Sequence, residues 1–317
     1  MKQVRRWASP AVAVVVLAVV IWRVGSGPFL NGLKAADGRA VVAAVVIVFV
    51  TTLCSAWRWT IVADGLGVRL SVPAAVAAYY RALFLNLTLP SGIAGDVHRA
   101  VSHGREVHDV SRAVRAVVWE RAAGQVVQIA LTIAVLLAFP SPVRSSMPYV
   151  VVAVIGACAA LALADRLRVA APQSRWTRVR NAVVADIRDG VLRRRALPAV
   201  VLTSVAIVAG HTVTFLIAAR TVGVNAPISR LLPLAMLALL AMVLPNVGGW
   251  GPREGVTAWA FAAAGLGASH GAAAAVTFGV LVLAASLPGA IVLLVGWLPQ
   301  RRLSGTPSRT RVVHRPE

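Results

Sequence analysis

The chain has 317 residues, of which 58% are hydrophobic and only 14% are charged. Runs such as "LVLAASLPGAIVLLVGWL" contain no charge over 18 residues, which excludes a soluble globular domain because soluble core helices rarely stay uncharged for so long. The net charge of +21 would indicate nucleic acid in a soluble protein. Here most basic residues lie between apolar runs, which the positive-inside rule explains, so we expect no nucleic-acid partner.

The apolar segments predict an all-α polytopic membrane protein. A membrane β-barrel is disfavoured because these segments do not alternate apolar and polar residues. We read the first segment as a retained span rather than a signal peptide, because "IWRVGSGPF" is a poor cleavage site. Six segments are long enough to cross a bilayer: 8–24, 40–62, 113–139, 148–164, 197–219 and 271–298.

Two further apolar stretches are less regular. Residues 73–90 contain Arg81 and end at Leu89-Pro90, and residues 231–268 are divided in the middle by a second Leu-Pro and its glycines. Each is predicted to form a re-entrant hairpin that returns to its own side. The order of span, broken hairpin and span then occurs twice, in repeat A (40–139) and repeat B (197–298), with opposite orientations. Inverted repeats with discontinuous helices are typical of transporters.

The distribution of arginines predicts that both termini are cytoplasmic. With that orientation most of the 32 lysines and arginines face the cytoplasm, including Arg58 and Arg69, while Arg81, Arg121 and Arg253 fall at membrane depth. The basic linker 165–195 is interpreted as an amphipathic helix against anionic lipid, and the tail 299–317 as disordered.

The two breaks carry the candidate site. Proline and glycine at membrane depth imply a cavity, because unpaired backbone groups are too costly in hydrocarbon, and charged groups there are functional candidates. Asp96–Arg99 could instead be an interfacial ion pair and Glu120–Arg121 an end-of-helix pair; Asn86 and Asn246 could line the cavity or only cap half-helices. The candidate substrate-binding residues are Asn86, Pro90, Gly95, Asp96, Arg99, Glu120, Arg121, Asn246, Gly249, Gly251, Arg253 and Glu254.

Other polar residues give weaker signals. His98, His103 and His108 recur every five residues, which spreads them around a helix and argues against metal binding. His211 lies in mid-span and could relay protons or pack through a hydrogen bond. The sequence shows no nucleophile with a base on one face, so we expect no enzymatic activity, no metal and no cofactor.

Three motifs resemble the transmembrane domain family of lysylphosphatidylglycerol synthase/flippase proteins. They are "FLNLTLPSGIAGDVHRA" (84–100), "AVRAVVWERAAG" (113–124) and "LAMVLPNVGGWGPREG" (240–255). The chain departs from the family pattern at Ser91, at Asn246-Val247 and at Pro252-Arg253. The resemblance implies a bacterial plasma membrane. It also implies the lipid-translocating part of such proteins, because no aminoacyl-transferase domain follows the last apolar segment.

Two functions follow from these observations. The first is a flippase-like lipid translocase that moves an anionic, aminoacylated or glycosylated headgroup between leaflets. Arg99 and Arg253 would bind its phosphate, and Asp96, Glu120 and Glu254 would balance them or bind a cationic headgroup. The alternative is a non-catalytic membrane partner that presents lipid to a separate glycosyl- or aminoacyl-transferase. In both, the expected partners are membrane lipids.

Overall fold

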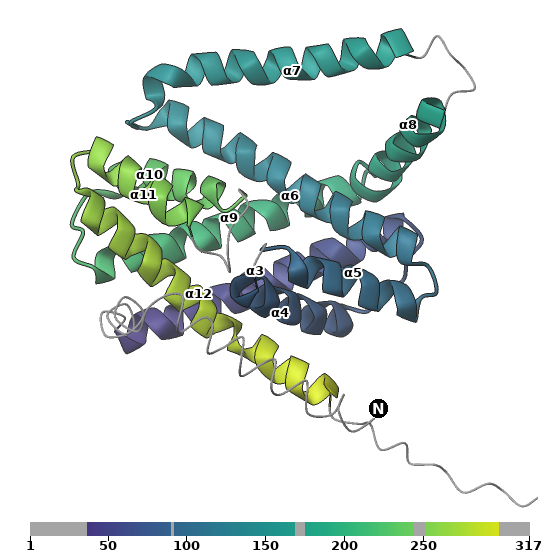
Figure 1. The fold of residues 1–317 in the computed structure, drawn as a ribbon, viewed down its shortest axis with the longest axis horizontal. Coiled ribbons are helices and arrows are strands. Elements are labelled where there is room, and N and C mark those ends of the chain that lie inside the picture. The colour runs from purple at the N-terminus through teal and green to yellow at the C-terminus, as the bar shows by residue number, and fades with distance from the viewer. Residues whose placement is uncertain (1–36, 90–91, 169–174, 244–250, 298–317) are drawn as a thin grey trace, which may run out of the picture.

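The computed structural model describes residues 37–89, 92–168, 175–243 and 251–297. Within these ranges the secondary structure is helical (Figure 1). The elements are α3 (Gly38–Gly65), α4 (Val72–Thr88), α5 (Ala94–Glu106), α6 (Val110–Ala138), the 3-10 turn η1 (Arg144–Ser146), α7 (Met147–Arg168), α8 (Arg175–Asp186), the π-helical turn η2 (Ile187–Val191), α9 (Ala196–Thr221), α10 (Ile228–Ala241), α11 (Pro252–Ala263) and α12 (Ala268–Trp297).

Four helices in the described part of the chain are long and apolar enough to cross a membrane. They are Gly38–Gly65, Val110–Ala138, Ala196–Thr221 and Ala268–Leu294, and they correspond to four of the six predicted spans. The predicted span 148–164 forms α7, which lies along one edge of the molecule (Figure 1). The predicted span 8–24 lies outside the described residues. The protein is therefore a multi-pass helical membrane protein.

Each predicted broken stretch forms a pair of short helices. In the first, α4 ends at Thr88, before Pro90, and α5 begins at Ala94 and packs back on α4. In the second, α10 ends at Ala241 and α11 begins at Pro252. Gly251 precedes α11 with a φ of 112°, a left-handed conformation that glycine adopts without strain. The order long, short, short, long thus occurs in a first unit, α3–α6, and again in a second unit, α9–α12.

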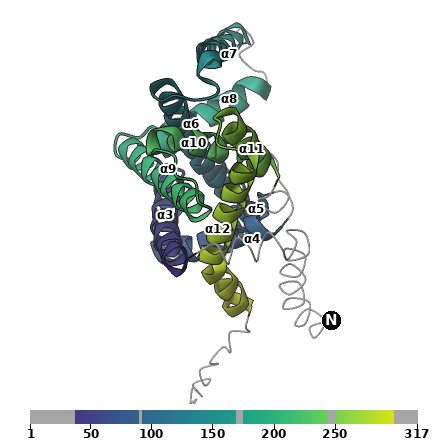
Figure 2. The ribbon, with the colours of Figure 1, turned by 90° about the vertical axis from the view of Figure 1, so that its left-hand side faces the viewer.

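The two units pack against each other in a reciprocal way. α4 of the first unit packs on α12 of the second, and α10 of the second unit packs on α6 of the first. α3 and α9 lie side by side, as the views in Figures 1 and 2 also show. One apolar core joins helices α9 to α12, with Ala40, Ala44 and Leu87 from the first unit, and a smaller one lies among α3, α4, α5 and α6 around Trp59.

The C-terminal end of the linker between the two units packs on the helix bundle. The predicted helix of the linker is present as α8, and η2 follows it and packs on α3, α6 and α9. Asp186 is buried at this junction, where it accepts a hydrogen bond from Trp119 Nε1 at 3.1 Å and pairs with Arg115 at 3.3 Å. The end of α8 therefore contacts protein through a charged residue.

Candidate functional site

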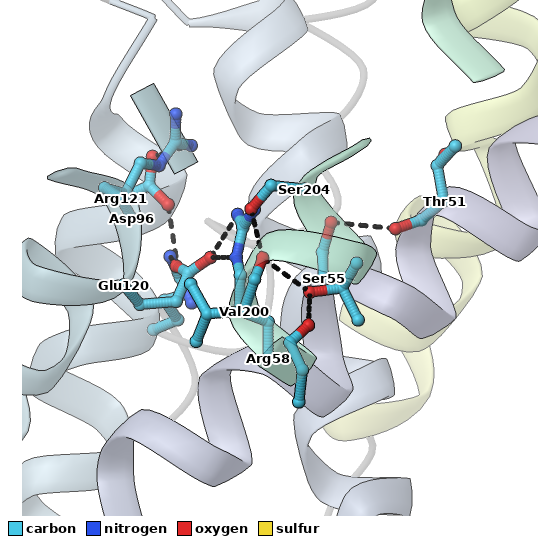
Figure 3. Close-up of polar contacts among 11 residues, drawn as sticks. Thr51, Ser55, Arg58, Asp96, Glu120, Arg121, Val200 and Ser204 are labelled. Carbon is cyan, nitrogen blue, oxygen red and sulfur yellow. Dashed lines mark hydrogen bonds and ion pairs between the residues drawn. The ribbon is translucent and has the colours of Figure 1, made fainter. Parts of the chain in front are cut away.

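Five charged side chains form a connected ion-pair network inside the first unit. Alternating positive and negative groups run in the order Arg58, Glu120, Arg99, Asp96 and Arg121. We call this set the Arg–acid network. Figure 3 shows its contacts running from Arg121 and Asp96 through Glu120 to Arg58. Three arginines face two carboxylates, so the network keeps one positive charge that its own acids do not balance.

Glu120 lies at the centre of the network and is fully buried. Its Oε1 accepts a hydrogen bond from Arg58 Nε at 2.9 Å, and its Oε2 accepts one from Arg99 Nη2 at 2.7 Å. Arg58 comes from α3, Arg99 from α5 and Glu120 from α6. A buried carboxylate is tolerated only when it is paired and hydrogen-bonded, and these two arginines supply that pairing. The network therefore joins three helices through one anion.

Asp96 forms the second junction, at the start of α5. Its Oδ1 accepts from Arg99 Nε at 2.9 Å, and its Oδ2 accepts from Asn86 Nδ2 at 2.9 Å and from Arg121. Asp96 also lies in the first turn of α5, where the helix dipole favours an anion. Asp96 is only 7% exposed, so the predicted Asp96–Arg99 pair is present and is buried in the protein.

Asn86 both caps α5 and lines a cavity. Its Oδ1 accepts a hydrogen bond from the backbone N–H of Gly95 at 2.7 Å, which satisfies a donor at the start of the helix. Gly95 is needed for this arrangement, because a Cβ there would lie 2.1 Å from the carbonyl oxygen of Ala82. Asn86 thus has both of the roles considered in the sequence analysis, as a cap of a short helix and as a residue that lines a cavity.

Beside the network lies a cavity of about 250 Å³, which we call the central cavity. Helices of both units form its wall: the end of α4 and the turn residue Gly92 on one side, and the end of α10 on the other. Arg58 and Arg121 lie in this wall, whereas Glu120 does not line it. The other polar residues of the wall are Thr51, Thr52, Ser55, Tyr79, Asn86, Gln125, Gln128, Ser204 and His211.

The charged residues that follow the second break have different contacts from those that follow the first. Glu254 accepts hydrogen bonds from the N–H of Gly251 at 2.6 Å and from Arg253 Nε at 2.9 Å, so it caps the start of α11. Arg253 is 2% exposed, and its guanidinium lies 5.2 Å from the ring centroid of Phe278. Neither residue lines the central cavity. Asn246 and Gly249 lie outside the described residues, as does Pro90 of the first break.

The candidate site residues predicted from the sequence do not include Arg58. It is 7% exposed within α3 and joins the Arg–acid network. Its Nη1 also donates to Ser204 Oγ of α9 at 2.8 Å (Figure 3). The signal was present, because Arg58 falls inside the apolar segment 40–62, and an arginine within a span is a functional candidate.

Glu120 and Arg121 do not pair with each other as neighbours. Glu120 binds Arg58 and Arg99, and Arg121 binds Asp96. Consecutive residues on a helix point about 100° apart, which favours separate partners. His211 lines the central cavity and its ring lies 6.4 Å from that of Phe278. The described residues contain no group of three or more side chains arranged to hold a metal ion.

Residues 6–289 match the family model described as lysylphosphatidylglycerol synthase TM region. The chain belongs to this family. The match spans both units and the linker between them, and it agrees with the resemblance carried by the three motifs. The family connects this membrane domain to lipid modification. Neither a curated protein nor a solved structure matches the chain.

Proposed function

We propose that this protein is a lipid translocase that moves an anionic, aminoacylated or glycosylated headgroup between the leaflets of the bacterial plasma membrane. The observation that carries the proposal is the central cavity, whose wall is built by both units and combines apolar residues with polar ones, including two arginines of the Arg–acid network. Irregular backbone and charge at membrane depth are tolerated where they line such a cavity. Membership of the lysylphosphatidylglycerol synthase TM region family supports a lipid substrate.

Arg121 is the residue best placed to bind the headgroup phosphate. Its side chain is 43% exposed, in contrast to the fully buried side chain of Arg99. It lines the central cavity and gives one nitrogen to Asp96, which leaves further guanidinium donors for a phosphate. Asp96 would hold Arg121 in place. The hydroxyl and amide groups of the wall would replace the water that the headgroup loses.

The reciprocal packing supports an inverted repeat. α4 contacts the last long helix of the second unit, and α10 contacts the last long helix of the first. Two units related by a two-fold axis would make these paired contacts, and an axis in the membrane plane is typical of transporters with inverted repeats. We infer that the two hairpins enter from opposite faces, with both termini cytoplasmic. The protein would then bind and move lipid, and any covalent change of the headgroup would belong to a separate transferase.

Headgroup movement in proteoliposomes tests the proposal. A fluorescent phosphatidylglycerol is incorporated in both leaflets, and the fraction that an external quencher reaches is followed over time. Arg121→Gln should slow the movement by roughly tenfold or more, because one charge-assisted hydrogen bond to phosphate is lost. The control is Arg112→Gln on the same helix, whose side chain is 45% exposed and pairs with Asp109, and it should move lipid as the parent does.

Two outcomes would count against translocation. Equal rates for Arg121→Gln and the parent would remove Arg121 from the mechanism. A parent protein that binds the labelled lipid but never moves it between leaflets would favour the lipid-presenting partner of a transferase. Repeating the assay with an aminoacylated and a glycosylated lipid identifies the preferred headgroup.

A further inference from the structure

A second cavity, of about 360 Å³, lies on α4 and α5 beside the C-terminal part of α12. It shares no lining residue with the central cavity. We call it the Arg81 recess. Its polar residues are Trp59, Arg81, Arg99, Ser102, His103 and Glu106.

The Arg81 recess collects buried hydrogen-bond donors that have no acceptor. Arg99 Nη1, Arg81 Nε, Trp59 Nε1 and both ring nitrogens of His103 are buried without a hydrogen-bond partner in the structure. Trp59, Arg99 and His103 are 0%, 1% and 6% exposed. In either neutral tautomer His103 has one N–H to donate. Unpaired buried donors are rare in proteins, and several in one cavity indicate a ligand that supplies acceptors.

The charged residues of the Arg81 recess favour binding of an anion. Arg81 and Arg99 contribute two guanidinium groups. Among the described lining residues Glu106 is the one carboxylate, and its side chain is 66% exposed. Glu106 Oε2 lies 3.7 Å from His103 Nδ1, which is beyond hydrogen-bond distance. A tetrahedral oxyanion offers acceptors in several directions, which suits donors that come from three helices.

Arg99 is held in place before any ligand binds. Two of its nitrogens are bound by Asp96 and Glu120. Its guanidinium also lies over the rings of Tyr79 and Trp59, at 4.2 and 4.6 Å from their centroids. A guanidinium fixed by two carboxylates and two rings loses little freedom on binding, so its remaining Nη1 is a preorganised donor.

We propose that the Arg81 recess binds a phosphate group, carried either by a membrane lipid or by a small phosphorylated solute. The remaining wall is apolar and includes Leu70, Ala77, Ile291 and Val292, which suits the glycerol or acyl part of a lipid. This site is separate from the central cavity and does not depend on translocation, because a lipid-presenting subunit would use it equally well. Its volume lies within the usual range of small-molecule sites.

Calorimetric titration of the purified full chain in detergent tests this proposal. The probes are short-chain phosphatidylglycerol, short-chain diacylglycerol with the same acyl chains, and inorganic phosphate. Binding of phosphatidylglycerol but not of diacylglycerol is expected. Arg81→Met and His103→Phe each remove a donor while keeping bulk, and each should raise Kd roughly tenfold, the usual effect of one hydrogen bond to a charged group.

Two variants control for charge and folding. Arg105→Met removes an exposed positive charge from the same helix as His103 and should leave Kd unchanged. Arg81→Lys keeps the charge and should restore most of the affinity, which separates phosphate binding from a folding defect in Arg81→Met. Arg121→Gln should still bind, so a failure of translocation and a failure of this site are distinguishable.

The arms of the titration also separate the two sources of phosphate. Inorganic phosphate that competes with phosphatidylglycerol assigns the site to a small solute, and its failure to compete assigns it to a lipid. Equal affinity for phosphatidylglycerol and diacylglycerol would overturn the proposal. Unchanged affinity in both Arg81→Met and His103→Phe would overturn it as well.

Discussion

At the scale of single residues, Glu120 is the buried anion that holds two buried arginines together. It is fully buried, and it separates the guanidinium groups of Arg58 and Arg99. Without its charge, two buried cations would remain with fewer anions near them. Burial makes such an imbalance costly, because neither water nor salt screens it well.

Glu120→Gln should therefore destabilise the protein by about 3–5 kcal/mol, the usual cost of breaking a buried ion pair from one side. Thermal unfolding in detergent measures the loss. The matched control is Asp64→Asn, which removes a carboxylate that is 69% exposed and 3.7 Å from Arg193, and exposed pairs contribute about 0–1 kcal/mol. A Glu120→Gln protein as stable as the parent would show that the arginines find other anions.

The network also shows how far sequence reasoning reached. The Asp96–Arg99 pair was predictable, because residues three apart on a helix are neighbours. The partners of Glu120 were not, because Arg58 and Arg99 lie 62 and 21 residues away in sequence and meet it only through packing of α3, α5 and α6. Both breaks were predicted as hairpins from Leu-Pro and glycine. Glu254, in contrast, was predicted to bind substrate, but it caps a helix outside the cavity wall. The proline two residues before it makes a helix-start pattern that could have indicated the cap.

At the scale of helices, two glycines allow α4 to contact its neighbours closely. A Cβ at Gly95 would lie 2.1 Å from Ala82 O, and one at Gly289 would lie 2.0 Å from Tyr80 O. Both contacts are with backbone atoms of α4, which cannot move aside as a side chain can. The position of α4 between α5 and α12 is thus set by the absence of two side chains.

Gly95→Ala and Gly289→Ala should each destabilise the protein by about 1–3 kcal/mol, as overpacking does in well-packed interiors. The control is Gly255→Ala in α11, where a Cβ would meet nothing within 4 Å. That change should be neutral or slightly stabilising, because alanine favours the helix. Thermal unfolding of the three variants compares them. Equal stability of Gly95→Ala and Gly255→Ala would show that α4 can shift to make room.

At the scale of the whole molecule, the proposed inverted repeat depends on which face of the membrane each loop occupies. In the orientation proposed above, with both termini cytoplasmic, the linker between the units would also face the cytoplasm, and the loops after α6 and α9 would face outwards. These surfaces contain exposed arginines that can be replaced by cysteine: Arg178 in α8, Arg144 in η1 and Arg230 in α10.

Single cysteines at these positions should label from opposite faces. Cys54 and Cys158 are first replaced by alanine, and a membrane-impermeant maleimide is applied to intact cells. Arg144→Cys and Arg230→Cys should react, whereas Arg178→Cys should react only after the cells are opened. Labelling of Arg178→Cys in intact cells would reverse the orientation. A shared face for Arg144→Cys and Arg178→Cys would mean that α7 does not cross the membrane.

The hydrogen bond from Arg58 to Ser204 has a consequence for movement. All five members of the Arg–acid network belong to the first unit, whereas Ser204 belongs to α9 of the second. The wall of the central cavity comes from both units. If one unit rocks against the other, the cavity changes shape while the ion pairs stay intact, and this charge-assisted hydrogen bond to a hydroxyl is the contact of the network that must break and form again. The first unit, held together by its ion pairs, would then move as one rigid body, and α9 of the second unit would slide along it.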